Sequence, residues 1–232
     1  MNQEVTVEFG VVLDHLPLLV GGALRGVVYA VGGFVIGIAC AALIILGRMA
    51  WSRWVTIPSQ IFVEIVRNTP FLLQAFFLYF GLAKLGVMMP GYVAAIIIVT
   101  FNSAAYATEI LRSGMLGIPK GLLEAGDSLG FTALQQFRYV VARPMLRAAL
   151  PALSGQFIII MLNTSLLSAI AIPELNYEAS NLASTSFRPF EVYVVVAVIY
   201  LTLSSVFAGL FALISRRVSG SWGSERRMQD IV

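Results

Sequence analysis

The sequence predicts an all-α integral membrane protein of about five transmembrane helices, and three observations support this prediction. Hydrophobic residues make up 59% of the 232 residues, charged residues make up only 12%, and the mean hydropathy is +0.88. A soluble domain carries about 25% charged residues, so this chain lacks the polar surface that water requires. The apolar residues also gather in runs long enough to cross a hydrocarbon core of about 30 Å.

Five apolar runs define the expected spans. They cover about residues 18–46, 55–85, 93–111, 146–172 and 192–214. The second run is interrupted at Asn68-Thr69-Pro70, where proline has no N–H to donate to a helix. A membrane protein tolerates such a break only where the segment is buried in protein or lines a cavity, so a solute path near the break is expected.

Lysine and arginine residues predict the orientation, because cytoplasmic connections carry an excess of them. The sequence therefore predicts an extracytoplasmic segment 1–17, a transmembrane domain 18–217 with a cytoplasmic loop at about 112–147, and a cytoplasmic tail 218–232. The N-terminus is outside and the C-terminus inside. The net charge of +3 is then explained by the lysine and arginine residues of the cytoplasmic connections. No nucleic-acid partner is expected. The connections assigned to the cytoplasm hold Arg48, Arg53, Arg112, Lys120, Arg138, Arg143, Arg147, Arg216, Arg217, Arg226 and Arg227, whereas the opposite ones hold Glu4, Glu8, Asp14, Glu174, Glu178, Arg188 and Glu191.

Several kinds of chemistry are excluded. The chain has one cysteine, Cys40, and one histidine, His15, which removes disulfide frameworks, Cys/His metal clusters and Cys–His nucleophile pairs. A phosphate-binding P-loop requires Gly-Lys-Ser/Thr, and neither Lys84 nor Lys120 stands in that context. We therefore expect no metal, no cofactor and no enzymatic activity in this chain. If ATP hydrolysis drives the function of this chain, a partner subunit must bind the nucleotide.

The loop at 112–147 is predicted to form a compact knob of two short helices. Residues 122–129 have helical character and stop at Gly130, a residue suited to a left-handed C-terminus. Thr132 and Gln135 form the pattern of a capping box that opens a second helix, which Arg143-Pro144 is expected to end. Ala125, Gly126 and Gly130 are small enough for another surface to approach, and Glu124 offers it a charge. The pattern alone fits docking of a partner and packing on the bundle equally well.

The loop resembles the EAA loop of ABC-transporter permease subunits, through Glu124-Ala125-Gly126 and Gly130. Further motifs, in order and in register over residues 18–217, resemble the polar amino acid importers of the histidine/glutamine type. These are Val63-Glu64, Arg67-Asn68-Thr69-Pro70, Ala105-Tyr106, Glu109-Ile110-Leu111-Arg112, Gly117-Ile118-Pro119-Lys120-Gly121, Leu150-Pro151, Gln156-Phe157, Asn163-Thr164-Ser165-Leu166 and Phe187-Arg188-Pro189-Phe190-Glu191-Val192-Tyr193.

The resemblance implies a type I ABC importer permease fold in the bacterial cytoplasmic (inner) membrane. It implies that Glu124, Ala125, Gly126 and Gly130 couple the chain to a cytoplasmic ATPase dimer. It also implies an extracytoplasmic solute-binding protein and a second permease subunit, with a polar amino acid or a close relative such as an opine as cargo.

Three positions depart from the family pattern. Gly126 stands where alanine is usual, and Pro144 closes the loop one place late. Leu162 stands where a lysine usually precedes the Asn/Asp-Thr-Ser motif. A symmetric pair of such chains would present two leucines to a substrate carboxylate, so the resemblance predicts a heterodimer whose second permease supplies the missing charge.

Charged and polar side chains within the spans are the candidate functional groups, because they are costly in a membrane. Glu64 and Arg67, and likewise Glu109 and Arg112, are spaced to pair on one helix face, either as structural ion pairs or as part of a gate. The polar groups either line a solute path or bond neighbouring helices. The candidates are Asn163, Thr164, Ser165 and Ser168, expected well inside the fourth span, with Gln74 and Asn102.

Two other functions compete with an ATP-driven importer. A secondary transporter for a small polar solute predicts inverted repeats with broken helices in corresponding positions, and only one broken span is evident. An intramembrane enzyme needs paired catalytic groups, which the single histidine and single cysteine do not provide.

Overall fold

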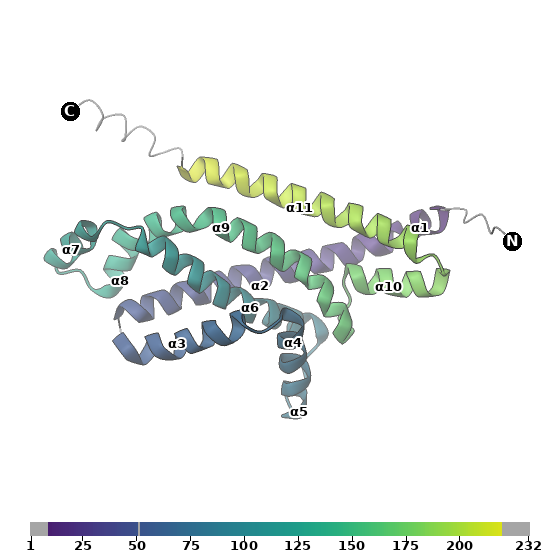
Figure 1. Ribbon diagram of the computed structural model, residues 1–232, viewed down its shortest axis with the longest axis horizontal. Coiled ribbons are helices and arrows are strands. Elements are labelled where there is room, and N and C mark those ends of the chain that lie inside the picture. The colour runs from purple at the N-terminus through teal and green to yellow at the C-terminus, as the bar shows by residue number, and fades with distance from the viewer. Residues whose placement is uncertain (1–8, 51, 220–232) are drawn as a thin grey trace.

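The computed structural model is an elongated bundle whose long helices run along one axis (Figure 1). It describes residues 9–50 and 52–219, so the acidic residues predicted at positions 4 and 8 and most of the predicted tail lie outside the described residues. The short helices α7 (Lys120–Ser128) and α8 (Ala133–Gln136) lie at one end of the bundle. The helices α1 (Gly10–Asp14) and α10 (Leu175–Ser186) lie at the other.

The predicted number of spans is confirmed for the described residues. Four helices there are long and apolar enough to cross a membrane, and a fifth span results if one sharply bent pair is counted together. The four are α2 (Leu16–Ala50), α6 (Gly91–Leu116), a continuous helix over residues 133–170, and α11 (Pro189–Ser219). The predicted runs 18–46, 93–111 and 192–214 lie within α2, α6 and α11, whereas the helix over residues 133–170 begins and ends before its predicted run, 146–172.

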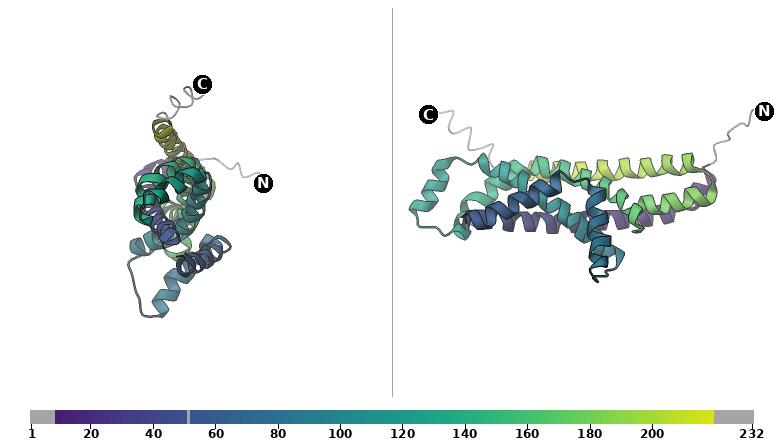
Figure 2. Two further views of the ribbon diagram at one scale, coloured as in Figure 1. Left: turned by 90° about the vertical axis from the view of Figure 1, so that its left-hand side faces the viewer. Right: turned by 60° about the horizontal axis from the view of Figure 1, so that its bottom comes forward.

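The bent pair contains the predicted break. Helix α3 (Ser52–Arg67) ends directly before Asn68-Thr69-Pro70, and the chain then turns through 112°. We call the segment after the turn the arm; it comprises α4 (Phe71–Phe76), a π-helical turn (Phe77–Gly81) and α5 (Leu82–Lys84). The arm stands away from the bundle in Figure 1 and in the right-hand view of Figure 2. The position of the break followed from the sequence, but the direction of the arm did not.

The core forms where α2 packs against α6, and small residues allow the two backbones to come close. A Cβ added at Gly33 would lie 2.5 Å from the Cβ of Val99, and one added at Gly37 would lie 2.6 Å from the Cβ of Ser103. Small residues at helix contacts are how membrane helices gain van der Waals packing, since lipid offers no hydrophobic driving force between helices. Any larger side chain at Gly33 or Gly37 would force α2 and α6 apart.

The knob differs from its prediction at its second helix. The capping box between Thr132 and Gln135 is present, and Gly130 has φ +70° as a left-handed residue. The predicted end at Pro144 is wrong, because α8 continues through a π-helical turn (Phe137–Val141) into α9 (Ala142–Asn163). Proline in a helix clashes with the carbonyl four residues earlier. Here that residue, Val140, lies in the irregular π turn, which relieves the clash.

The connection between the fourth and fifth spans contains a helix that was not predicted, α10. Its apolar residues Leu175, Ala179 and Leu182 form a small core with Leu19 of α2 and Val192 of α11. Helix α11 otherwise lies along the outside of the bundle (Figure 1), where Phe157 of α9 meets the rings of Phe207 and Phe211 at centroid distances of 4.8 and 5.3 Å.

Candidate functional site

The break after α3 is held by two buried amide side chains. Pro70 has no N–H and cannot donate to the carbonyl oxygen of Val66. The side chain of Gln74 in the arm supplies a donor in its place. Its Nε2 donates to the backbone oxygens of Val66 and Thr69, both at 2.7 Å. The Nδ2 of Asn102 on α6 donates in turn to the Oε1 of Gln74 at 2.9 Å. Both amide side chains are almost fully buried. The two residues therefore satisfy the broken backbone and fix the bend against α6.

A groove of about 420 Å³ opens beside this break, and residues from three segments that are distant in sequence line it. Asn163, at the end of α9, is the one member of the predicted 163–168 patch that reaches the groove. Asn102 contributes to its wall, whereas Gln74 lies behind it as the support for Asn102. The lining residues are Arg67, Asn68, Thr69, Pro70, Phe71, Asn102, Tyr106, Gln156, Ile159 and Asn163.

The two predicted ion pairs have different outcomes. Arg112 pairs with Glu109, with Nε 3.0 Å from Oε2. The expected pair of Glu64 and Arg67 is not formed in the described part of the chain: the carboxylate of Glu64 accepts from the side chain of Asn68 at 3.2 Å instead. Two opposite charges three residues apart on a helix can form an ion pair, but other neighbours can bind either side chain instead.

All four charged residues open into a second groove of about 690 Å³ on the face of α3 and α6. Arg48 of α2 also lines it, and the hydroxyl of Ser59 accepts from the Nε of Arg48 at 2.8 Å. Charged side chains cannot face hydrocarbon without a large free-energy cost. This face of the bundle must therefore be covered by water or by another protein chain.

The remaining polar residues of the fourth span lie elsewhere than predicted. Thr164, Ser165 and Ser168 stand in a 3-10 helix (Thr164–Ile170) at the end of the span, because the helix begins and ends earlier than expected. Their hydroxyls donate to carbonyls of the preceding turn at 2.6 to 2.7 Å. Asn176 of α10 donates to the Oγ of Ser168 at 2.9 Å. These three hydroxyls bond the end of the span to itself and to α10.

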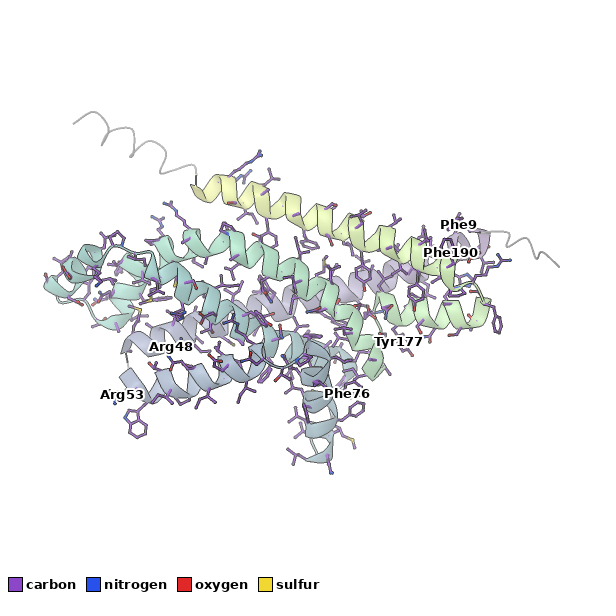
Figure 3. The ribbon with its side chains drawn as sticks, viewed as in Figure 1. Phe9, Arg48, Arg53, Phe76, Tyr177 and Phe190 are labelled. Atoms are coloured by element: carbon purple, nitrogen blue, oxygen red, sulfur yellow. The ribbon has the colours of Figure 1, made fainter. Side chains whose placement is uncertain are left out.

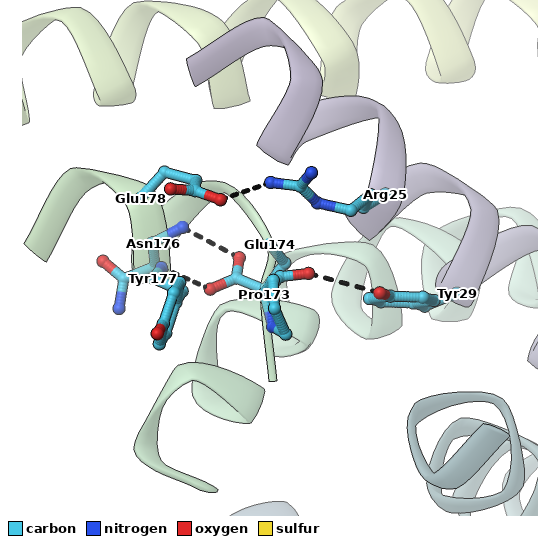
Figure 4. Close-up of polar contacts among 7 residues, drawn as sticks. All are labelled: Arg25, Tyr29, Pro173, Glu174, Asn176, Tyr177 and Glu178. Carbon is cyan, nitrogen blue, oxygen red and sulfur yellow. Dashed lines mark hydrogen bonds and ion pairs between the residues drawn. The ribbon is translucent and has the colours of Figure 1, made fainter. Parts of the chain in front are cut away.

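A polar cluster between α2 and α10 was not predicted (Figure 4). Arg25 of α2 forms an ion pair with Glu178 of α10. The hydroxyl of Tyr29 donates to the carbonyl of Pro173 at 3.2 Å. Arg25 is a single charge in an otherwise apolar run of 29 residues, and that signal would have been sufficient to find it.

Glu174 is the buried centre of this cluster. Its side chain is inaccessible to solvent and caps α10 by accepting from the backbone N–H groups of Asn176 and Tyr177 at 2.9 and 2.8 Å. Burial raises the pKa of this carboxyl to about 7, although these bonds and one from the hydroxyl of Tyr200 act to lower it. The cluster fastens α10 to α2 and α11.

The knob presents one exposed face and one buried face. Glu124 and Ala125 are exposed, as the docking prediction requires. Gly126 is buried, and a Cβ there would meet Gln136 and Val140 at 3.5 Å, so it packs against the second helical part of the knob and also lines the groove between the two parts. Gly130 has open space around it and serves the turn. A groove of about 700 Å³ runs along the knob, with Ala125 and Leu129 on one side and Tyr139 and Arg143 on the other.

Arg48 and Arg53 lie at the same end of the bundle as the knob, whereas Phe9 and Phe190 lie at the opposite end (Figure 3). Two of the basic residues that the sequence assigns to the cytoplasm thus lie at the knob end. Among the residues that the structure describes, no group of three or more His, Cys, Asp or Glu side chains could hold a metal ion.

Comparison with known proteins places this arrangement in a family. Residues 33–220 match the model of the "binding-protein-dependent transport system inner membrane component". The chain is 31% identical to the octopine transport system permease protein OccM of Rhizobium meliloti, over 92% of this chain and 91% of that protein. It is 32% identical to the glutamine transport system permease protein GlnP of Escherichia coli K12, over 91% of this chain and 97% of that one.

A solved structure, described as an amino acid ABC transporter with histidines, superposes with a TM-score of 0.82 at 30% sequence identity. It covers 92% of this chain and 100% of the matched chain. A methionine ABC transporter in an inward-facing conformation, at 23% identity and a TM-score of 0.70, shares the fold. The chain therefore belongs to the family of inner-membrane components of binding-protein-dependent transport systems, and it is the permease subunit of an ABC importer.

Proposed function

We propose that this permease carries a polar amino acid, or a close relative such as an opine, into the cell by alternating access. The observation that carries the proposal is the similarity, over nearly the whole of each chain, to permeases for glutamine and octopine. The groove beside the helix break supports it, because Asn102, Asn163 and Arg67 offer a polar solute the hydrogen bonds and charge that hydrocarbon lacks.

The proposed machine has three kinds of partner. A cytoplasmic ATPase dimer binds ATP and docks on the knob through Glu124 and Ala125. An extracytoplasmic binding protein delivers the solute at the end of the bundle that holds α1 and α10. A second permease subunit covers the charged face of α3 and α6, and we propose that it is a different chain, because Leu162 of this chain offers a substrate carboxylate no charge.

The orientation is part of the same proposal. Segment 1–17 lies outside, the knob and tail 218–232 lie in the cytoplasm, and α10 lies at the outer surface. The gathering of Arg48 and Arg53 at the knob end supports this arrangement.

Labelling of single cysteines tests the orientation. In a Cys40→Ala background, a cysteine at Ser180, exposed on α10, is expected to react in intact cells with a thiol reagent that cannot cross membranes. A cysteine at Ser128, exposed on the knob, is expected to react only after the cells are opened. Reaction of Ser128→Cys in intact cells would overturn the topology.

Transport in proteoliposomes tests the function. The chain, purified with its ATPase, second permease and binding protein, is expected to import at least one solute from a radiolabelled mixture of the twenty common L-amino acids and octopine when ATP is supplied on the ATPase side. A complex whose ATPase carries a substituted P-loop lysine is the control and is expected to import none. Uptake that continues without ATP hydrolysis, or the absence of import of every solute in the mixture, contradicts the proposal.

A further inference from the structure

Two opposite charges stand unpaired on one turn of α3, at the point where that helix breaks. Glu64 and Arg67 are three residues apart and both are exposed. Glu109 and Arg112 have the same spacing on α6 and do form an ion pair. The pair on α6 shows that a glutamate and an arginine at this spacing can form an ion pair, whereas the two residues on α3 do not.

Separate neighbours hold the two charges apart. Asn68 donates through Nδ2 to both the backbone oxygen and the Oε2 of Glu64, at 2.9 and 3.2 Å. The guanidinium of Arg67 lies over the ring of Tyr106, 5.8 Å from its centroid, in a cation–π contact. Among the described residues no carboxylate lies within ion-pair distance of Arg67. A guanidinium has five N–H donors, so it retains the capacity to bind a planar anion in the bidentate manner.

The space between the two charges is a small pocket. Glu64, Arg67, Asn68 and Tyr106 line a cavity of about 220 Å³. Three of these residues also line the groove of about 420 Å³, so the pocket opens directly into it. The pocket is thus a charged compartment adjoining a groove whose other walls are amide and apolar side chains.

We propose that this pocket binds the zwitterionic head group of the transported solute. Arg67 takes the α-carboxylate, Glu64 takes the α-ammonium, and the side chain of the solute extends toward Asn163. A ligand with both charges on one carbon matches a carboxylate and a guanidinium one helical turn apart, about 5–6 Å between Cβ atoms. Binding gives each of the two exposed charges a partner, which offsets the cost of removing them from water when the solute covers the pocket. The inference rests on the proposed amino-acid cargo and adds the residues that recognise it.

Equilibrium binding to the complex of this chain, its second permease and the ATPase in nanodiscs tests the site. The binding protein is left out, so that its own selectivity does not enter the measurement. The probes are the L-amino acid that the wild-type complex imports and the α-amide of that amino acid, which has no carboxylate. Arg67→Gln is expected to weaken binding of the amino acid about tenfold, the loss of one charge-assisted contact, and to leave binding of the α-amide unchanged.

Glu64→Gln provides the complementary measurement. It is expected to weaken binding of the amino acid by a similar factor while leaving binding of the matching deaminated carboxylic acid unchanged. Arg112→Gln is the matched control, because it makes the same chemical change in the pair that is already satisfied on α6. It is expected to leave the affinity ratio between the amino acid and its α-amide at the wild-type value.

The outcomes separate this inference from the function on which it rests. Equal weakening of amino acid and α-amide by Arg67→Gln, or no weakening, overturns the head-group site. Absence of saturable binding to a wild-type complex that imports the amino acid also overturns it and leaves the proposed function intact. A wild-type complex that imports neither an amino acid nor octopine refutes the function itself. Unstimulated ATP hydrolysis at the wild-type rate shows that each variant has assembled.

Discussion

Replacing Glu124 with lysine is expected to abolish coupled transport, because it reverses a charge on the exposed face of the knob where the ATPase is proposed to dock. Replacing Gly126 with leucine is expected to have an equally large effect by another route. A side chain there meets Gln136 and Val140 and would push α7 away from the second half of the knob. Co-purification of the ATPase and the ratio of ATP hydrolysed to solute imported measure both effects.

The two variants can be distinguished, because Glu124→Lys changes an exposed charge whereas Gly126→Leu changes the packing inside the knob. Glu124→Lys is expected to leave the thermal stability of the permease unchanged, whereas Gly126→Leu is expected to lower it. Lys84→Glu is the control, because it reverses an exposed charge at the end of the arm; it is expected to leave the ATPase bound. Normal ATPase binding and normal transport in both knob variants would exclude the knob as the docking element.

The features that could be predicted from the sequence are those that depend on neighbouring residues. The spans followed from apolar runs, and the capping box at Thr132 followed from a four-residue pattern. The position of the break followed from Pro70, which has no N–H to donate. Each of these rests on the chemistry of one short segment, and packing against distant segments did not alter it.

The features that could not be predicted arise where distant segments meet. The side chain of Gln74 reaches the carbonyl oxygen of Val66 only because the arm turns back. Asn102, 28 residues further along the chain, donates a hydrogen bond that holds the side chain of Gln74 in place. Arg25 and Glu178 are 153 residues apart in the chain. Asn163, Thr164, Ser165 and Ser168 look alike in sequence, yet only Asn163 lines the groove. The spacing of residues in one helix does not contain this information.

The family membership also decides between the competing functions. This chain belongs to a family of binding-protein-dependent systems and is the permease subunit of an ABC importer, so it is not a secondary transporter. The described residues contain one broken span, which is consistent with that result, because inverted repeats would place a second break in the corresponding half. We propose instead that the break serves the charged pocket beside it.

The second large effect concerns the second permease. Leu162 is 41% exposed at the end of α9, directly before Asn163 of the groove. A symmetric pair would present two hydrocarbon side chains at this level, and a carboxylate passing them without a partner would lose several kcal/mol of solvation. We expect a different chain to supply a cation there, so that a carboxylate meets the partner's charge beside Leu162 and then Arg67 of this chain.

Expression of this permease with only its ATPase and binding protein decides the question. Import is expected to be absent or at least about a hundredfold below that of the full set, which corresponds to a difference of about 3 kcal/mol at 1.4 kcal/mol for each factor of ten. Addition of the second permease is expected to restore it. A Leu162→Lys variant sharpens the test, because it places the missing cation in this chain and is expected to give the minimal set partial activity. Full substrate-stimulated transport by the wild-type minimal set would show that two identical chains suffice and that hydroxyl groups, backbone amides or water satisfy the carboxylate beside Leu162.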